Sequence, residues 1–489
     1  MTDRSLCIHG HFYQPPREDP LTGSIPPEVG AAPYQNWNER IHAECYRPNA
    51  ERGNFERISF NIGPTLFGWM EQHDPATYRL IVEQDRANVR RYGAGNAIAQ
   101  CYNHTIMPLA TRADKETQVA WGVADFAHRF GRPPQGMWLP ETAVDIETLG
   151  IMADFGVEFT ILAPWQAADD ALDPTEPYRV DLPGGRSIVA CFYHQGLSGR
   201  VSFDSALTTN ADEFALHDLA GQYNAEKAAR GEPQLILVAS DGELYGHHQP
   251  FRDMFLAHLL GTSSAQSGIE PTFLARWLRE HPPRRPVALR ERTSWSCHHG
   301  VGRWMDDCGC TPAGGRWKAA LRSACDRLAA ALDTVYAAVL RPFVADPWGL
   351  RQRYIHVLLG ELEIADLIGD AAGRRLPAET VGRVHTLLEA QRERQRMFTS
   401  CGWFFDDFDR IEPKNNVAYA ARAVQLTQMA AGVNLSPLAV EALRHVVSPR
   451  SGLRADQVFM RQLGRAESYG VRQLSFLAGV QAGREIGVT

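Results

Sequence analysis

The sequence contains little of what an exported, membrane-spanning or nucleic-acid-binding protein requires. Its first residues, MTDRSLCIHGHF, carry charges at Asp3 and Arg4 and lack the apolar core of a signal peptide. The longest strongly apolar stretch, Leu235 to Ala239, is far shorter than the ~20 residues that cross a bilayer. No basic run is long enough to follow a phosphate backbone, and the net charge is −7. We therefore expect a cytoplasmic protein that binds neither membranes nor nucleic acid.

The composition also argues against a disulfide-stapled or disordered chain. Nine cysteines, an odd number in 489 residues, fit free thiols in a reducing compartment. Hydrophobic residues make up 44% and charged residues 22%, which is typical of a packed globular protein. At ~150 residues per domain, the length predicts two or three domains.

Short apolar runs with helical patterns between them predict a parallel sheet wrapped by helices. Several of these runs are almost continuously apolar, as in strands covered on both faces, which favours a barrel over a sandwich. The runs are Ser5–Phe12, Arg57–Ile62, Asn96–Tyr102, Gly136–Pro140, Phe159–Ala163, Ser187–Tyr193 and Gln234–Ser240. A helix is predicted from Ile146 to Phe155, because apolar residues recur every three positions and Gly156 follows as a terminator.

The pattern changes in the second part of the chain, where long Ala-, Leu- and Arg-rich segments predict helices. These segments are Arg316–Val339, Tyr354–Asp370, Ala378–Met397 and Asn416–Ala431. We therefore expect an α/β barrel in residues 1–285 and a mostly helical domain in residues 286–489. The segment Glu291 to Gly315, rich in Trp, His, Cys and Gly, resembles neither a helix nor a linker.

Polar residues lie at the ends of the predicted strands, where parallel barrels place their active sites. Thr142 and Asp145 resemble a capping box that opens the next helix, which would put Glu141 at the mouth of the barrel. Asp241 directly follows an apolar strand. A first-turn glutamate and a turn-forming aspartate are the simpler interpretations of these two residues. The polar residues at the strand ends are His9, His11, His104, Glu141, His194, Asp241 and Glu243.

Two carboxylates at the strand ends of one barrel are the minimal equipment for glycoside hydrolysis. One carboxylate attacks the anomeric carbon, and the other protonates the leaving oxygen. Aromatic rings offer flat apolar faces on which sugars can rest. The candidate rings are Trp138, Trp165, Trp295, Trp304, Trp403, Phe404 and Phe405, of which the dense Cys401–Asp407 stretch is the best suited to the rim of a cleft.

The order and spacing of several motifs resemble glycoside hydrolase family 57. They are His9-x-His11, FNIGPTL at Phe60–Leu66, GMWLPE at Gly136–Glu141, DGELYG at Asp241–Gly246 and, more weakly, Met397–Asp407. The resemblance implies an incomplete (β/α)7 barrel followed by a helical domain that helps to shape the cleft. It also implies a retaining α-glycosidase or 4-α-glucanotransferase that acts on α-glucans or maltooligosaccharides without a metal or other cofactor.

By motif position, the resemblance makes Glu141 the nucleophile, Asp241 the acid/base and His11 a substrate-binding residue. We expect further substrate contacts from His9, His104, Trp138, Trp165, His194, Glu243, Trp403 and Phe404. Phe12 and Tyr13 stand between the second histidine and Gln14-Pro15, where many members of the family have Gln-Pro directly. This departure leaves the preferred linkage and chain length open. Hydrolysis and transglycosylation, which share one intermediate, also stay open, as does the oligomeric state.

Two other functional classes deserve comparison. A metal-dependent carbohydrate enzyme, such as a deacetylase or an α-mannosidase-like hydrolase, could use His9, His11, His104 and Asp241 as ligands. Against it, no predicted helix carries a His-x3-His pair, and the first motif is His-x-His rather than His-x-Asp. A non-catalytic carbohydrate-binding protein is disfavoured because both carboxylates are present.

A separate group of soft ligands, Cys297-His298-His299 and Cys308-x-Cys310, is sufficient for a structural zinc. Its spacing is not that of a standard zinc finger. Free thiols and cleft histidines are therefore the favoured interpretation of these residues.

Overall fold

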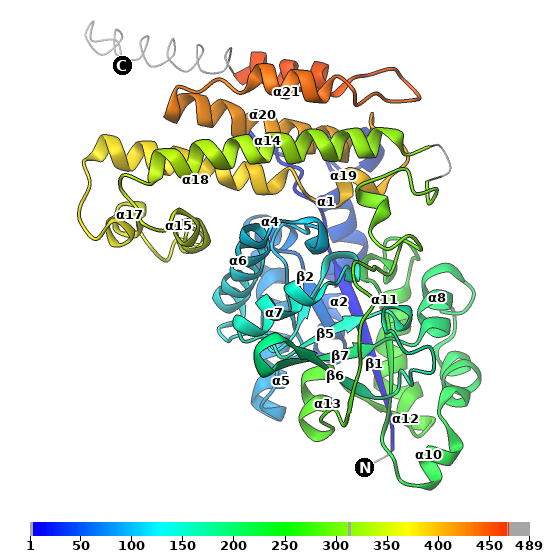
Figure 1. Cartoon of the computed structure of the whole chain (residues 1–489). Coiled ribbons are helices and arrows are strands. Elements are labelled where there is room, and N and C mark those ends of the chain that lie inside the picture. Colours follow the sequence, from blue (N-terminus) through cyan, green and yellow to red (C-terminus); the bar gives the residue numbers. More distant parts are fainter. Residues whose placement is uncertain (1–2, 312–313, 467, 469–489) are drawn as a thin grey trace, which may run out of the picture. The chain divides into compact units, whose positions relative to one another are not determined.

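The computed structural model describes residues 3–311, 314–466 and 468. The chain divides into two units. One comprises residues up to Pro16 together with Pro26–Val301, and the other comprises Arg17–Ile25 and residues from Gly302 onward. The first unit mixes strands and helices and the second is helical (Figure 1). The protein is thus an α/β fold with a helical C-terminal region. None of the helices in the described ranges is long and apolar enough to span a membrane.

Each of the seven predicted apolar runs contains a strand. These strands are β1 (Arg4–Phe12), β2 (Ser59–Ile62), β3 (Ala99–Gln100), β4 (Met137–Trp138), β5 (Phe159–Leu162), β7 (Arg186–Phe192) and β8 (Gln234–Asp241). Three further strands in the described residues lie outside the predicted runs: β6 (Pro177–Leu182), β9 (Glu270–Pro271) and β10 (Arg285–Pro286). Of these, β6 pairs antiparallel with β7 through a tight turn at Gly184 and Gly185, which both have positive φ.

The seven predicted strands follow one another side by side in parallel. β1 pairs with β2 on one side and β8 on the other, β3 pairs with β4, and β5 pairs with β7. Single bridges, Phe60 to Ala97 and Gly136 to Phe159, link β2 to the β3 segment and β4 to β5. The His194 N–H, just beyond β7, donates to the carbonyl of Leu237 in β8 at 2.7 Å. The carboxyl ends of these strands therefore lie along one edge.

Helices surround the strands of the first unit (Figure 1). They are α1 (Trp37–Ile41), α2 (Arg47–Glu51), α3 (Asn54–Arg57), α4 (Pro64–His73), α5 (Pro75–Tyr92), α6 (Arg112–Phe130), α7 (Ile146–Asp154), α8 (Gln195–Phe203), α9 (Ala211–Glu213), α10 (Ala225–Ala229), α11 (Arg252–His258), α12 (Ser264–Gln266) and α13 (Leu274–Glu280). The long helices begin at local caps: the carboxylate of Asp74 accepts from the Thr77 N–H at the start of α5, and the hydroxyl of Thr111 accepts from the Asp114 N–H at the start of α6.

The helix predicted after the fourth strand is confirmed, but its predicted cap is wrong. Helix α7 is capped by Asp145, whose side chain accepts from the Thr148 N–H at 2.8 Å. Thr142 cannot serve as the cap, because it lies in the preceding turn at φ 49°, where its hydroxyl donates to Gln166 Oε1 at 2.9 Å. The helix ends before Gly156, at φ 80°, as predicted.

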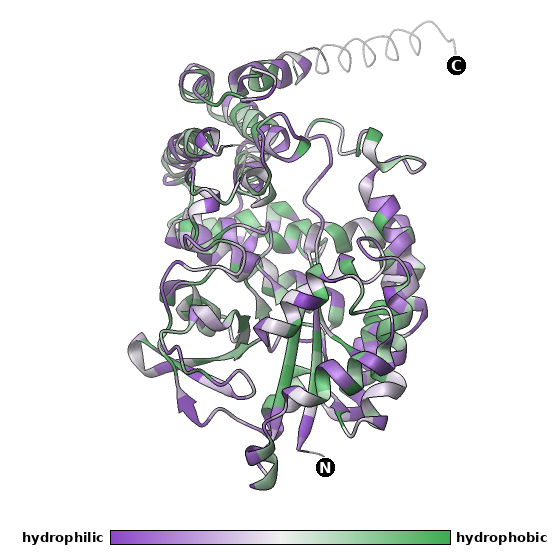
Figure 2. Ribbon diagram, turned by 90° about the vertical axis from the view of Figure 1, so that its right-hand side faces the viewer, coloured by the Kyte–Doolittle hydropathy of each residue, from purple (hydrophilic) through white to green (hydrophobic). Residues whose placement is uncertain are grey.

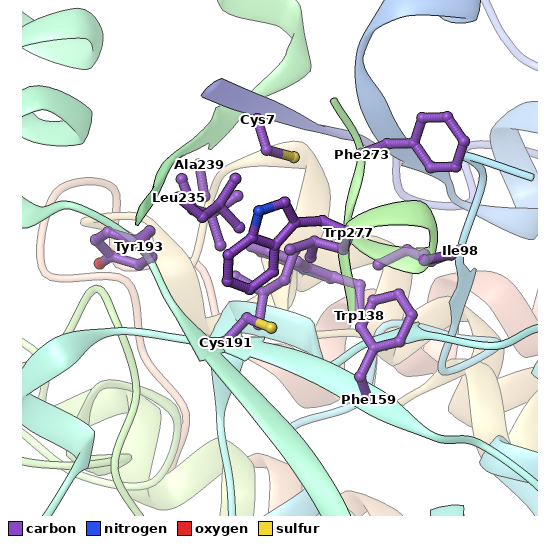
Figure 3. Packing of buried hydrophobic residues seen from close by; sticks show 14 of the residues in the cluster. Cys7, Ile98, Trp138, Phe159, Cys191, Tyr193, Leu235, Ala239, Phe273 and Trp277 are labelled. Atoms are coloured by element: carbon purple, nitrogen blue, oxygen red, sulfur yellow. The ribbon is translucent and has the colours of Figure 1, made fainter. Parts of the chain in front are cut away.

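The first unit has a hydrophobic core to which several of its strands contribute. Side chains from β1, β4, β5, β7 and β8 converge there, and Phe273 and Trp277 of the α13 segment pack against them (Figure 3). Hydrophobic stretches run through the interior strands (Figure 2), as in Leu235–Ala239 of β8, and β1 is buried from Ser5 to Phe12. Two-sided burial explains the continuous apolar runs in the sequence.

The second unit consists of helices, of which α14, α18 and α20 pack against one another. Its helices are α14 (Arg316–Leu340), α15 (Pro347–Arg353), α16 (Ile355–Leu358), α17 (Ile364–Ala372), α18 (Ala378–Arg396), α19 (Cys401–Phe404), α20 (Ile411–Ala431) and α21 (Ser436–Leu443). Three of the four predicted helices are confirmed. The predicted single helix Tyr354–Asp370 is wrong, because the chain leaves the helix at Gly360, with φ 71°, and re-enters it at Ile364.

Candidate active site

His11 lies between two other polar residues at the carboxyl end of the sheet. In the β1–β2 pairing it stands opposite Asn61, and in the β1–β8 pairing it stands opposite Asp241. The parallel register thus brings residues from three separate parts of the sequence together. Two of them were predicted from their place at strand ends, and Asn61 was not.

Asn61 joins the histidines into one buried hydrogen-bonded network. Its Oδ1 lies 3.1 Å from His9 Nε2, and its Nδ2 lies 2.9 Å from His11 Nδ1. When the amide donates to His11 Nδ1, the His11 proton sits on Nε2, which faces His104 Nε2 at 3.1 Å. Desolvation lowers the pKa of both His9 and His11 to about 3, so both imidazoles are neutral at pH 7.

Aromatic rings stack on this network. The Trp138 ring lies 4.9 Å from that of His11 and 5.0 Å from that of His9, in both cases nearly parallel. Tyr13 stacks on His104 at 3.8 Å between ring centroids. Trp295 meets Trp138 edge-on at 5.0 Å. The predicted residues His9, His11, His104 and Trp138 therefore form one contiguous cluster.

Glu141 occupies a strained turn directly after β4. Its φ is 58° and that of Thr142 is 49°, values that side chains other than glycine rarely adopt. Two donors hold its carboxylate, because Trp295 Nε1–H and the Ser296 hydroxyl both donate to Oε2, at 2.9 and 2.6 Å. The backbone N–H of Trp295 also donates to the backbone carbonyl of Glu141 at 3.0 Å. The side chain is therefore fixed in one orientation.

Asp241, the last residue of β8, is arranged to keep its proton. Solvent reaches its side chain, yet protein surrounds it closely enough for desolvation to be the largest cause of a pKa raised to about 8. Repulsion by the charges of Glu243 and Glu141 adds to the rise. Asp241 is consequently protonated at pH 7, whereas an ordinary aspartate is ionised.

Glu243 is buried and held at Oε1 by two donors. The Tyr46 hydroxyl donates at 2.6 Å and the Tyr13 N–H at 3.0 Å. Desolvation raises its pKa to about 7. Gly242, between the two acids, packs against the Phe12 ring so closely that a Cβ there would lie 2.3 Å from it. The Asp-Gly-Glu sequence therefore lets β8 approach the end of β1.

The remaining predicted substrate-binding residues have other partners. Trp165 is half-buried, and its indole donates to the Ser294 carbonyl at 3.0 Å. His194 caps α8, with Nδ1 accepting from the Leu197 N–H at 3.1 Å. Trp403 is 1% exposed in the helical unit and donates to the Lys318 carbonyl at 3.2 Å. Phe404 lies against the Arg303 guanidinium. A contact of these four with substrate stays a prediction.

Sequence reasoning did not assign a role in the site to Asn61, Tyr46 or Ser296, and it named Trp295 only as one aromatic among several. Asn61 carried a signal, since it falls within the FNIGPTL motif at the end of β2. Trp295 and Ser296 lie in the segment that resembled neither helix nor linker. Tyr46, in the π-helical turn His42–Tyr46, gave no sequence signal of its contact with Glu243.

The family model described as "Glycosyl hydrolase family 57" matches residues 21–289, more than half of the chain. The chain belongs to glycosyl hydrolase family 57. A second model, described as a domain of unknown function (DUF3536), matches residues 315–473, which correspond to the helical region.

Similar proteins include other members of glycosyl hydrolase family 57. An α-amylase from Pyrococcus horikoshii is 21% identical over 274 residues, which are 53% of this chain and 40% of that protein. An exo-type maltose-forming amylase from Pyrococcus sp. ST04 superposes with a TM-score of 0.75 at 17% identity, covering 94% of this chain and 88% of the other. A family 57 branching enzyme from Thermococcus kodakaraensis gives 0.58 at 16% identity, covering 95% and 94%. At these identities the structural matches establish a shared fold.

Proposed function

We propose that this family 57 protein is a retaining α-glycosidase or 4-α-glucanotransferase that acts on α-glucans. The observation that carries the proposal is that two unlike carboxyl groups lie at the carboxyl ends of two parallel strands, β4 and β8, close enough for the charge of Glu141 to act on Asp241. Glu141 is held by the donors Trp295 and Ser296, while Asp241 keeps its proton because of desolvation and nearby negative charge. One group suits a nucleophile and the other a general acid.

The reaction proceeds in two displacements. A Glu141 carboxylate oxygen attacks the anomeric carbon as the glycosidic C–O bond breaks, and Asp241 gives its proton to the leaving oxygen. Asp241, now ionised, then removes a proton from water or from a sugar hydroxyl, which attacks the same carbon and releases Glu141. Two inversions give net retention, so an α-linked substrate yields an α-product. Water and an acceptor sugar differ only in the second step, which gives hydrolysis or transfer.

The strand order supports an incomplete (β/α)7 barrel in residues 1–285. Parallel pairings and single bridges join the strands in the order β1, β2, β3, β4, β5 and β7, each to the next. β8 pairs with the other side of β1, and its Leu237 carbonyl accepts the hydrogen bond from the His194 N–H just beyond β7. Both carboxyl-bearing residues follow strands of this set. The barrel would place Glu141 and Asp241 around one opening.

The substrate class follows from the kinds of protein that share the fold. The solved structures with this fold include an exo-type maltose-forming amylase and a 4-α-glucanotransferase from Thermococcus litoralis, the latter with a TM-score of 0.53. The neutral, stacked His9, His11 and Trp138 suit binding of an uncharged sugar better than of a charged ligand.

The decisive experiment is to follow the anomeric form of the first product by NMR with maltooligosaccharides. We expect the α-anomer first, and chromatography of the products should show whether shortened chains or rearranged chains accumulate. Glu141→Ala should abolish turnover, and added azide should then yield a β-glycosyl azide from an activated α-glycoside. Initial release of the β-anomer by the unmodified enzyme would falsify the retaining mechanism.

A metal-dependent reaction at the same histidines is disfavoured by their hydrogen bonds. Both nitrogens of His9 are engaged, by the Ser59 hydroxyl and Asn61, and those of His11 by Asn61 and His104. Binding a cation would require these buried contacts to break.

A further inference from the structure

Four soft metal ligands lie close together in the segment of residues 297–310. Cys297, His299, Cys308 and Cys310 each offer one ligand atom, and these atoms all lie within 4.8 Å of one another. Within the residues that the structure describes, no other group of three or more His, Cys, Asp or Glu side chains meets this criterion. The sequence spacing favours free thiols, but the folded segment gathers them. We infer that these four residues bind one structural zinc ion.

The ligand set matches the chemistry of zinc. Three thiolates and one imidazole form a Cys3His site, which is tetrahedral with Zn–S distances of ~2.3 Å and Zn–N distances of ~2.0 Å. Neighbouring ligand atoms of such a tetrahedron lie about 3.5–3.8 Å apart. The observed spread, at most 4.8 Å, needs only small side-chain rotations to close. Because the protein fills all four positions, the ion would have no open site for catalysis, and the thiolates select zinc over magnesium or calcium.

The backbone of the segment is shaped for this arrangement. Gly309 stands between Cys308 and Cys310 at φ 77°, a left-handed conformation that turns the chain between the two thiols. Hydrogen bonds fix both flanks: the Ser294 hydroxyl donates to the Gly300 carbonyl at 2.6 Å, and the Gly315 N–H donates to Asp307 Oδ1 at 2.7 Å. Cys297 is 3% exposed, so its thiol is shielded from solvent within the segment.

The cluster directly follows the two residues that hydrogen-bond to Glu141, so a bound zinc would restrain them. Trp295 and Ser296, the two donors to Glu141 Oε2, directly precede the ligand Cys297. Fixing Cys297 to the ion restricts the backbone that presents both donors, as outer-shell contacts restrict a ligand. Trp295 and Ser296 are thus positioning residues held by the metal. This role rests on the proposed function of Glu141, whereas zinc binding itself does not.

Metal content tests the site directly. The full chain, produced in zinc-supplemented medium and freed of any affinity tag, should contain about one zinc per molecule by plasma mass spectrometry. Cys308→Ser and His299→Ala should lose it, and His298→Ala, a change at the exposed neighbouring histidine, should retain it. Cobalt(II) in place of zinc should give the charge-transfer and intense visible bands of a tetrahedral thiolate site. Trace zinc only, or equal zinc in His299→Ala and His298→Ala, would overturn the inference.

Alkylation covers the case in which the variants do not fold. Iodoacetamide applied to the unmodified folded protein should leave Cys308 and Cys310 unlabelled until a chelator removes the metal, as read by peptide mass spectrometry. Labelling at equal rates before and after chelation counts against zinc.

The positioning role has a separate readout. Loss of zinc should lower kcat far more than it raises KM. Trp295→Phe should retain zinc and should likewise lower kcat far more than it raises KM. Full kcat in zinc-free folded protein would refute this role. If no glycoside is turned over at all, the zinc stoichiometry still decides the site.

Discussion

Glu243→Gln should shift the pH dependence of the reaction without removing a reacting group. Glu243 is buried beside Asp241, and its charge is the second largest cause, after desolvation, of the raised Asp241 pKa. The raised pKa keeps Asp241 protonated as pH climbs toward 8, so that it can still donate to the leaving oxygen. A neutral glutamine removes the repulsion and leaves the desolvation, so Asp241 should lose its proton at lower pH.

The expected shift of the Asp241 pKa has an upper limit, because desolvation contributes more to the raised pKa than repulsion by Glu243 does. The Asp241 pKa rises from an ordinary value near 3.9 to about 8, and repulsion by Glu243 is smaller than desolvation. In Glu243→Gln, the alkaline limb of the kcat/KM profile should therefore move to lower pH by less than about 2 pH units. Glu243 has a pKa of about 7, so it is mostly ionised over the range in which Asp241 titrates, and the sign of the effect is fixed.

The assay is kcat/KM for a maltooligosaccharide across the pH range, because an unactivated leaving group depends on the acid. Tyr46→Phe is a second test, since it keeps the carboxylate but removes the 2.6 Å hydrogen bond that lowers the Glu243 pKa. With that pKa raised, Glu243 carries less charge where Asp241 titrates, so the alkaline limb should again move to lower pH, by no more than in Glu243→Gln. An alkaline limb that stays in place in Glu243→Gln, with kcat/KM reduced equally at every pH, would refute the electrostatic reasoning.

The other predictions test the remaining groups. Asp241→Asn should abolish turnover of substrates with poor leaving groups, whereas the first step with activated leaving groups should be spared. A carboxyl group with a raised pKa in the folded state lowers stability as the pH climbs from about 4 to about 8, so the variant should also melt at a higher temperature than the unmodified protein at pH 8. An unchanged or lower melting temperature at pH 8 would contradict the desolvation argument. Trp295→Phe removes one donor to Glu141 Oε2, which at about 1.5–3 kcal/mol for a charged hydrogen bond predicts a roughly 10- to 150-fold lower kcat; an unchanged kcat would show that this contact is not used. Trp403→Ala should cost about 3–5 kcal/mol of unfolding free energy by denaturant titration, because the ring is almost fully buried, and a raised KM for long glucans with unchanged stability would instead assign it to substrate binding.

Many of the strands and long helices could be predicted from the sequence because their signals are local. A strand buried on both faces must be apolar throughout, so runs such as Gln234–Ser240 predict their strands without knowledge of the neighbours. Parallel barrels place their active sites at the carboxyl ends of the strands, so Asp241 and Glu141 could be proposed as candidate site residues from their positions. Long helices of the second unit followed from periodicity in the same way. The prediction of one helix over Tyr354–Asp370 was wrong because a single left-handed glycine outweighed that periodicity.

Only the tertiary structure decided which groups meet. The donors to Glu141 come from Trp295 and Ser296, more than 150 positions away, and the donor to Glu243 comes from Tyr46, 197 positions away. No local pattern specifies such contacts, because they depend on how loops from different strands return to the same edge. The same holds for the pKa of Asp241, because its desolvation and its repulsion by Glu243 and Glu141 depend on groups that the fold brings around it.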